Sequence, residues 1–106
     1  MDAEWDTQKN AAGKVVHSYK TALIQLAYPT DAAGLVFNVI LIQCFAMQSL
    51  PLQLLSCLCD PEVTFVGRQL GGDIKKIARD FKDASHLSAK VQVLDLGVCM
   101  HASAAS

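Results

Sequence analysis

The sequence predicts a small α/β domain with a mixed five-stranded sheet, in which three antiparallel strands are followed by two parallel ones, with flanking helices. Runs of β-branched and aromatic residues recur in the first half of the chain and again at residues 63–66, as is typical of strands. An amphipathic helical pattern and a last apolar run, residues 91–96, follow. Such a strand-helix-strand unit is normally parallel with a right-handed crossover. A length of 106 residues favours one domain.

The first half of the chain predicts three neighbouring antiparallel strands joined by short connections. These strands are expected at residues 1–6, 15–27 and 35–42. The polar residues 6–14 contain Gly13 and are expected to form a loop or hairpin turn. Residues 28–34 contain a proline and a glycine, and form the second turn.

The apolar residues 35–59 are long enough for a membrane span, but several polar side chains and Pro51 interrupt them. A strand to Ile42, a loop to Ser49 and a helix from Leu50, with Pro51 in its first turn, fit better. No membrane partner is therefore expected. The leucines expected to cover the sheet are Leu52, Leu54, Leu55 and Leu58.

Residues 63–81 carry the central unit of the prediction. Residues 63–66 are expected to form a strand that is buried on both faces, and Gly71-Gly72 is expected to form a turn. A helix is then expected from Asp73, because apolar side chains recur at i, i+3, i+4 and i+7. The inward residues are Ile74, Ile77, Ala78 and Phe81, and the basic outer residues are Lys75, Lys76, Arg79 and Lys82.

The last part of the chain predicts one more buried strand. Residues 82–90 are expected to form a polar loop, and residues 91–96 a second buried strand. Asp95 is expected to cap a short final helical turn rather than to bind metal. Residues 102–106 are small and are expected to fray.

Three acidic residues are candidate metal ligands. Asp73 shares the i, i+4, i+8 row of Ile77 and Phe81, which directs its carboxylate toward the buried side. The alternative is that Asp73 caps the helix or complements its dipole. Asp2 and Glu4 leave the same face of a strand, and a divalent cation relieves the repulsion of such a pair. The alternative here is a charged, mobile terminus.

These stretches, in this order, resemble the 3′–5′ exonuclease domain of the Werner-helicase and ribonuclease D type. The resemblance runs from Asp2 to about Leu96. It rests on Asp-Ala-Glu-Trp, Thr-Ala-Leu-Ile-Gln-Leu-Ala, Leu-Pro-Leu-Gln-Leu-Leu, Phe-Val-Gly-Arg-Gln-Leu-Gly-Gly-Asp-Ile-Lys-Lys-Ile-Ala-Arg-Asp-Phe and Val-Leu-Asp-Leu. The resemblance implies a ribonuclease H-like fold and four acids around two Mg²⁺ or Mn²⁺ ions. Asp2 and Glu4 match the first acidic motif, and Asp73 matches the acid of the second.

By the same resemblance, Asp2 would bridge both ions, Glu4 would hold the first and Asp73 would support the second. One ion would activate a water against the terminal phosphodiester, and the other would stabilise the leaving 3′ oxygen. Lys75, Lys76 and Arg79 would contact a single-stranded 3′ end, whether DNA or RNA. Ordinary solvation of a basic helix face is the alternative, and the net charge of −1 gives no independent indication of nucleic acid.

The chain departs from the family pattern at its fourth acid. The family carries that acid as Tyr-x-x-x-Asp or His-x-x-x-x-Asp in a C-terminal helix, whereas nothing after Asp95 is acidic. Tyr28 and Asp31 lie on the wrong side of Asp73. Met1 directly precedes the first acid, where the family has most of an opening strand. The expectation is a single partial exonuclease domain over residues 1–106, incomplete at both ends and weak or inactive as an enzyme.

Two other functions stay open. One is a non-catalytic nucleic-acid-binding remnant, which would bind strands in a salt-dependent manner without cleaving them. The other is an interaction module of the same fold, whose uncovered face is completed by another chain. The hydrophobic content of 52% against a charged content of 18% is high for a small domain.

The four cysteines lie in apolar surroundings without Cys-x-x-Cys spacing. They are expected to be reduced, buried thiols of an intracellular protein, nuclear or cytoplasmic. The histidines are not spaced with another histidine or a cysteine as a zinc ligand set. The cysteines are Cys44, Cys57, Cys59 and Cys99, and the histidines are His17, His86 and His101.

Overall fold

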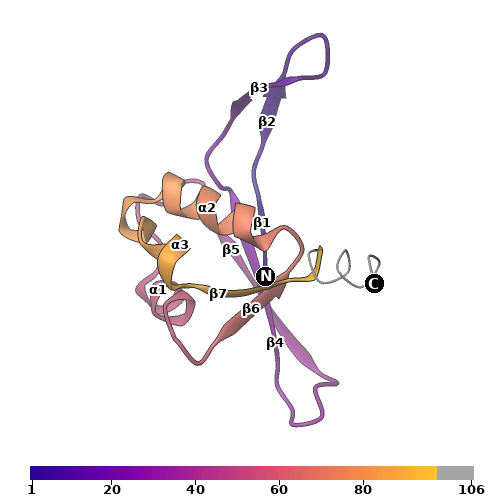
Figure 1. Cartoon of the computed structure of the whole chain (residues 1–106), viewed down its shortest axis with the longest axis vertical. Coiled ribbons are helices and arrows are strands. Elements are labelled where there is room, and N and C mark those ends of the chain that lie inside the picture. Colours follow the sequence, from indigo (N-terminus) through magenta and orange to yellow (C-terminus); the bar gives the residue numbers. More distant parts are fainter. Residues whose placement is uncertain (98–106) are drawn as a thin grey trace. The chain divides into compact units, whose positions relative to one another are not determined.

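The chain is a mixed α/β protein, as the computed structural model of residues 1–97 shows (Figure 1). It divides into two compact units, one formed by Ala3–Ala46 and the other by Met1–Asp2 together with the chain from Met47 onward. The predictions for Cys99, for His101 and for the tail at residues 102–106 lie outside the described residues.

The first unit contains, except for Asp2, a three-stranded antiparallel sheet in the order β1-β4-β5. Its strands are β1 (Asp2–Glu4), β4 (Leu23–Pro29) and β5 (Phe37–Gln43). β4 and β5 pair from Leu23 opposite Gln43 to Pro29 opposite Phe37. Asp31 closes the turn between them, because its Oδ1 accepts hydrogen bonds from the backbone N–H groups of Leu35 and Val36 at 2.9 and 3.2 Å. The prediction of three antiparallel strands is confirmed.

A second hairpin interrupts the predicted strand at residues 15–27. β2 (Thr7–Lys9) pairs antiparallel with β3 (Val15–Ser18), and β4 begins only at Leu23. The turn between β2 and β3 is held by Asn10, whose Oδ1 accepts from the N–H groups of Ala12 and Lys14, both at 3.0 Å. The prediction of one strand was wrong because its first part pairs with β2. The sequence of β2 is Thr-Gln-Lys, which has no apolar alternation that would identify it as a strand. A whole hairpin therefore connects β1 to β4, not a short connection.

The second unit begins with the helix α1 (Leu52–Leu58), which Pro51 precedes at the N-cap position. Leu54 and Leu58 are buried as predicted. The prediction was wrong for Leu52, whose exposed fraction is 76%, because the first residue of the helix points away from the buried side. In the described part of the chain, no helix is long and apolar enough to cross a membrane.

The strands β6 (Thr64–Gly67) and β7 (Gln92–Asp95) pair in parallel, which confirms the predicted direction. Residues 63–66 were predicted to be buried on both faces and residues 91–96 to form a second buried strand, and both predictions of burial were wrong. Phe65 is buried, but Val66 is 42% exposed and Leu94 is 44% exposed. Within residues 1–97, the hydrogen bonds between strands form separate sheets. One has the three strands β1, β4 and β5, another has β6 and β7, and the β2–β3 hairpin is a further two-stranded sheet.

The helix α2 (Leu70–Asp80) begins three residues before the predicted start. Gly71 and Gly72 lie in its first turn, so the prediction of a turn at these glycines was wrong. The chain turns at Gln69 instead, where φ is 53°. This earlier start adds the fully buried Leu70 to the row of Ile77 and Phe81.

Residues 82–90 form two short helices, not the predicted polar loop. They are the 3₁₀ helix η1 (Lys82–Ala84) and α3 (Leu87–Lys90). Ala84 and Leu87 are fully buried, and α2 contacts η1, α3 and β7. Two apolar side chains in a polar segment are enough to fold it onto the core, although they give no clear periodicity.

Candidate metal and nucleic-acid site

Asp2 and Glu4 lie on one face of β1. Both side chains are exposed, whereas Ala3 between them is only 6% exposed. The predicted alternation is therefore confirmed. Glu4 Oε1 accepts a hydrogen bond of 3.3 Å from Gln25 Nε2 on β4, and this bond restricts the orientation of its carboxylate.

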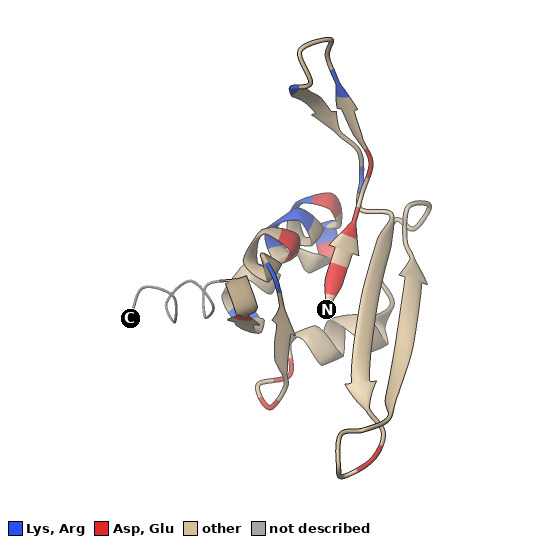
Figure 2. Ribbon diagram, turned by 90° about the vertical axis from the view of Figure 1, so that its right-hand side faces the viewer, with Lys and Arg blue, Asp and Glu red and all other residues tan. Residues whose placement is uncertain are grey.

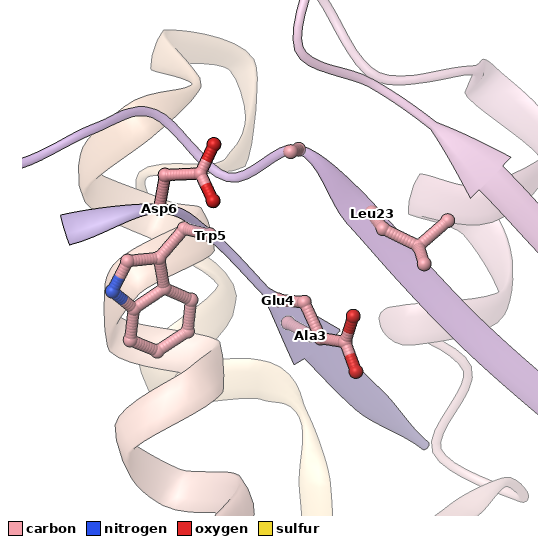
Figure 3. A pocket seen from close by; sticks show the side chains of 6 residues that line it. Ala3, Glu4, Trp5, Asp6 and Leu23 are labelled. Carbon is pink, nitrogen blue, oxygen red and sulfur yellow. The ribbon is translucent and has the colours of Figure 1, made fainter.

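A pocket with a volume of about 430 Å³ opens beside Glu4. Figure 3 shows the side chains of Glu4, Trp5 and Asp6 around it. Asp6 was not singled out from the sequence, although its spacing from Glu4 equals the spacing between Asp2 and Glu4. The pocket residues are Ala3, Glu4, Trp5, Asp6, Ala22 and Leu23.

Asp73 lies on the buried side of α2, as predicted, with an exposed fraction of 8%. It does not occupy the N-cap position, which belongs to Gln69. The backbone N–H of Asp73 donates to the carbonyl oxygen of Gln69 at 3.3 Å. Because Asp73 is in the first turn, its charge still complements the helix dipole.

The start of β1 lies beside the end of β6. The amino group of Met1 donates a hydrogen bond of 2.8 Å to the carbonyl oxygen of Val66. A Cβ placed on Gly67 would lie 2.5 Å from the carbonyl oxygen of Met1, so only glycine fits this approach. Asp2 directly follows Met1, and Asp73 lies in the first turn of α2, which begins three residues after Gly67.

The chemistry of the three acids suits a hard divalent cation, because carboxylate oxygens are the ligands that magnesium prefers. Asp2 and Asp73 belong to one compact unit and Glu4 to the other. Among residues 1–97, the structure gathers no three His, Cys, Asp or Glu side chains into a group that could hold a metal ion. The donor type therefore fits, while a ready three-ligand group is not found in that range.

The basic face of α2 is smaller than predicted. Lys75 and Arg79 are exposed, but Lys76 is only 5% exposed. Its Nζ lies 2.9 Å from Asp80 Oδ2, one turn further along the helix, and the blue and red segments of α2 appear in Figure 2. The prediction that Lys76 points outward was wrong, because residues 73, 76, 77 and 80 share one helical row.

Asp95 caps the turn that follows β7, as predicted. Its Oδ1 accepts a hydrogen bond of 3.0 Å from the N–H of Gly97, and residues 96 and 97 are helical. The same oxygen accepts a second hydrogen bond, from the N–H of Gln69 at 3.0 Å. No local pattern indicates this second contact, which links two residues 26 positions apart.

The thiols are not uniformly buried. Cys44 is fully buried, whereas Cys57 is exposed, so the prediction was wrong for Cys57. Cys59 is half-buried at the C-terminal end of α1, and its Sγ lies 3.5 Å from His86 Nε2. These two side chains alone form no zinc site, which requires four ligands or three and a water.

Comparison with protein-family models, with curated proteins and with solved structures found no match for this chain. The functional assignment therefore depends on the residues and their geometry.

Proposed function

We propose that this chain is a 3′–5′ exonuclease domain of the Werner-helicase and ribonuclease D type, with a ribonuclease H-like fold. Its substrate is a single-stranded 3′ end of a nucleic acid. Asp2, Glu4 and Asp73 are the metal-binding and catalytic residues. The 106-residue sequence holds three of the four acids that this mechanism uses, so cleavage should be slow or absent.

The observation that carries the proposal is the hydrogen bond between the amino group of Met1 and the carbonyl oxygen of Val66. This bond joins the start of β1, which holds Asp2, to the end of β6, which leads into α2 and Asp73. Carboxylates carried by two segments that a hydrogen bond joins are candidates to share a cation. The mixed α/β composition of the fold agrees with the proposal but does not identify it.

The acidic residues have distinct tasks in this proposal. Asp2 and Glu4 would hold Mg²⁺ or Mn²⁺ from the exposed face of β1, and Gln25 would keep the carboxylate of Glu4 in position. Asp73 would add a third carboxylate from the first turn of α2. The bound ions would supply an activated water and stabilise the charge of the leaving oxygen. Lys75 and Arg79 would attract the phosphates of the strand.

A second candidate is a nucleic-acid-binding domain of the same fold without catalysis. Two observations favour it. Residues 1–97 contain no ready group of three metal ligands, whereas Lys75 and Arg79 are exposed one turn apart on α2. Strand binding requires only such charges and salt-sensitive contacts with phosphates. Catalysis requires a metal held in fixed geometry, and is lost first.

The test combines metal binding and cleavage. Bound and free Mn²⁺ are measured by electron paramagnetic resonance, and a 3′-labelled single-stranded oligonucleotide is followed on a gel. We expect weak Mn²⁺ binding, and slow cleavage if any, and both should be lost in the Asp2→Ala, Asp73→Ala double variant. Glu62→Ala, which removes an exposed acid elsewhere, is the matched control and should behave like the original chain.

Circular dichroism distinguishes loss of metal binding from loss of folding, since Asp73 is buried. Asp73→Asn is the second variant, because it preserves the size of the side chain. Strand binding that persists without Mn²⁺ binding would favour the second candidate. Mn²⁺ binding that is equal in the double variant and the original chain would contradict the exonuclease proposal. Robust cleavage that depends on Asp2 and Asp73 would show that another acid fills the fourth position.

A further inference from the structure

Within residues 1–97, the strand β5 is an edge of the β1-β4-β5 sheet, since β4 alone is next to it in the sheet order. An edge strand presents a row of backbone N–H and C=O groups on its outer side, which form a template for another strand. β5 has seven residues, Phe37–Gln43, all of them aligned with β4. It is therefore long and regular enough to receive a partner strand along its whole length.

The side chains of β5 are apolar and exposed. Val39 is 64% exposed, Ile40 42% and Leu41 60%. These neighbouring residues point alternately to opposite faces of the sheet, so apolar surface is exposed on both faces of the edge. The exposed surface continues at Leu35, Val36, Phe37 and Phe45.

β5 lacks the features that normally prevent pairing at an edge. Residues 35–46 contain no Lys, Arg, Asp, Glu or Pro, and the β5 ribbon is tan throughout in Figure 2. Natural edge strands are usually protected by a charge, a proline or a bulge, and the register of β5 against β4 continues without a shift. Asn38 is the one polar residue in the middle of the strand, and its Nδ2 donates to the Tyr28 hydroxyl at 3.2 Å.

We propose that β5 is a self-association edge, on which a second copy of this chain adds its own β5 in antiparallel direction. The centre of the seven-residue strand is Ile40, so a two-fold axis there sets Ile40 opposite Ile40 of the second copy and Val39 opposite Leu41. The contact is apolar against apolar and carries no like charges, which would oppose it. Such a two-fold dimer covers the β5 edge of both copies at once. A second copy of the chain is therefore the partner that fits this edge.

The first experiment is sedimentation velocity at concentrations from about 1 μM to about 1 mM, the range in which weak and moderate dimers dissociate. We expect a monomer–dimer equilibrium. Ile40→Lys should raise the dimer dissociation constant at least about tenfold, because each dimer then places two like charges at its centre. Leu52→Lys is the matched control, with the same new charge on an exposed leucine of α1, and should leave the constant unchanged. Circular dichroism must show that both variants are folded.

The second experiment tests the register. Ile40→Cys and Phe37→Cys are compared in a chain with Cys57→Ser, Cys59→Ser and Cys99→Ser, which keeps the buried Cys44, and each is oxidised with oxidised glutathione. Directly opposed Cβ atoms are about 4.5–5.5 Å apart, close to the distance that a disulfide needs. Ile40→Cys should therefore form a covalent dimer several times faster than Phe37→Cys, which faces residue 43 of the second copy. A monomer at every concentration, equal weakening by Leu52→Lys, or equal cross-linking at residues 37 and 40 would overturn the proposal.

Discussion

Asp95 Oδ1 accepts a hydrogen bond of 3.0 Å from the backbone N–H of Gln69. Gln69 is the residue at which the chain turns from β6 into α2, with φ at 53°. Asp95 is the last residue of β7, the strand parallel to β6. The carboxylate therefore fixes the entry of α2 from the neighbouring strand, and through the N–H of Gly97 it also fixes the turn after β7.

We expect Asp95→Ala to lower the free energy of unfolding by about 1–3 kcal/mol, because two backbone N–H groups lose a charged acceptor. Asp95→Asn keeps an oxygen at the same place and should cost less. Urea unfolding followed by circular dichroism measures both. An Asp95→Ala variant as stable as the original chain would show that Gln69 and Gly97 do not depend on this carboxylate.

Gln69→Gly should stabilise the chain, although it removes a side chain. A non-glycine residue in the left-handed region costs about 1–2 kcal/mol, and glycine adopts that region without this cost. The greater freedom of glycine in the unfolded chain offsets part of the gain. We expect a net rise in the melting temperature of a few degrees. Arg68→Gly, at the preceding position, is the control and should lower it.

The pair of Lys76 and Asp80 should be strongly coupled, because the side chains are only 6% and 12% exposed. Asp80→Ala should cost about 3 kcal/mol, since it leaves the buried ammonium of Lys76 without this partner. Adding Lys76→Met to Asp80→Ala should recover a large part of that loss, which a double-mutant cycle in urea measures. Lys75→Met, on an exposed residue, should change stability by less than about 0.5 kcal/mol. Strictly additive losses would contradict the coupling.

If the nucleic-acid proposal holds, replacing Lys75 and Arg79 with alanine should change the salt dependence of strand binding. A plot of the logarithm of the binding constant against the logarithm of the salt concentration has a negative slope. Each phosphate contact with a single strand contributes about −0.7 to that slope. The slope of the double variant should therefore be less negative by about 1.4, as measured by fluorescence anisotropy. Lys9→Ala with Lys14→Ala, in the β2–β3 hairpin, is the matched control of equal charge. An equal effect of the two pairs would show that binding follows net charge and not the face of α2.

The sequence predicted the parts of the fold in which the spacing of apolar residues follows one clear period. The apolar runs of β4 and β5, the parallel pair β6 and β7, and the inward row of Ile77 and Phe81 all follow from local periodicity. The exposed pair Asp2 and Glu4 and the burial of Asp73 follow from the same reasoning. These are properties of single elements, which neighbouring residues determine.

The errors occur where a distant contact decides the outcome. Gly71-Gly72 looks like a turn, but Asp95 holds the turn at Gln69, so the glycines enter the helix. The error at Lys76 is local instead, because its partner Asp80 lies one turn further along the same helix. The metal-site and nucleic-acid predictions stay predictions, because ligand geometry depends on side chains from segments far apart in the sequence.

The β2–β3 hairpin should open before the rest of the chain unfolds. Every residue of β2 and β3 is exposed, so the hairpin depends on its own backbone pairing and on the Asn10 turn. Two strands without a buried face are marginally stable in water. The amide protons of residues 7–18 should therefore exchange with deuterium through local opening. Those of α2 should exchange only when the core unfolds. Trypsin should likewise cut after Lys9 and Lys14 in the native protein, long before it reaches Lys76.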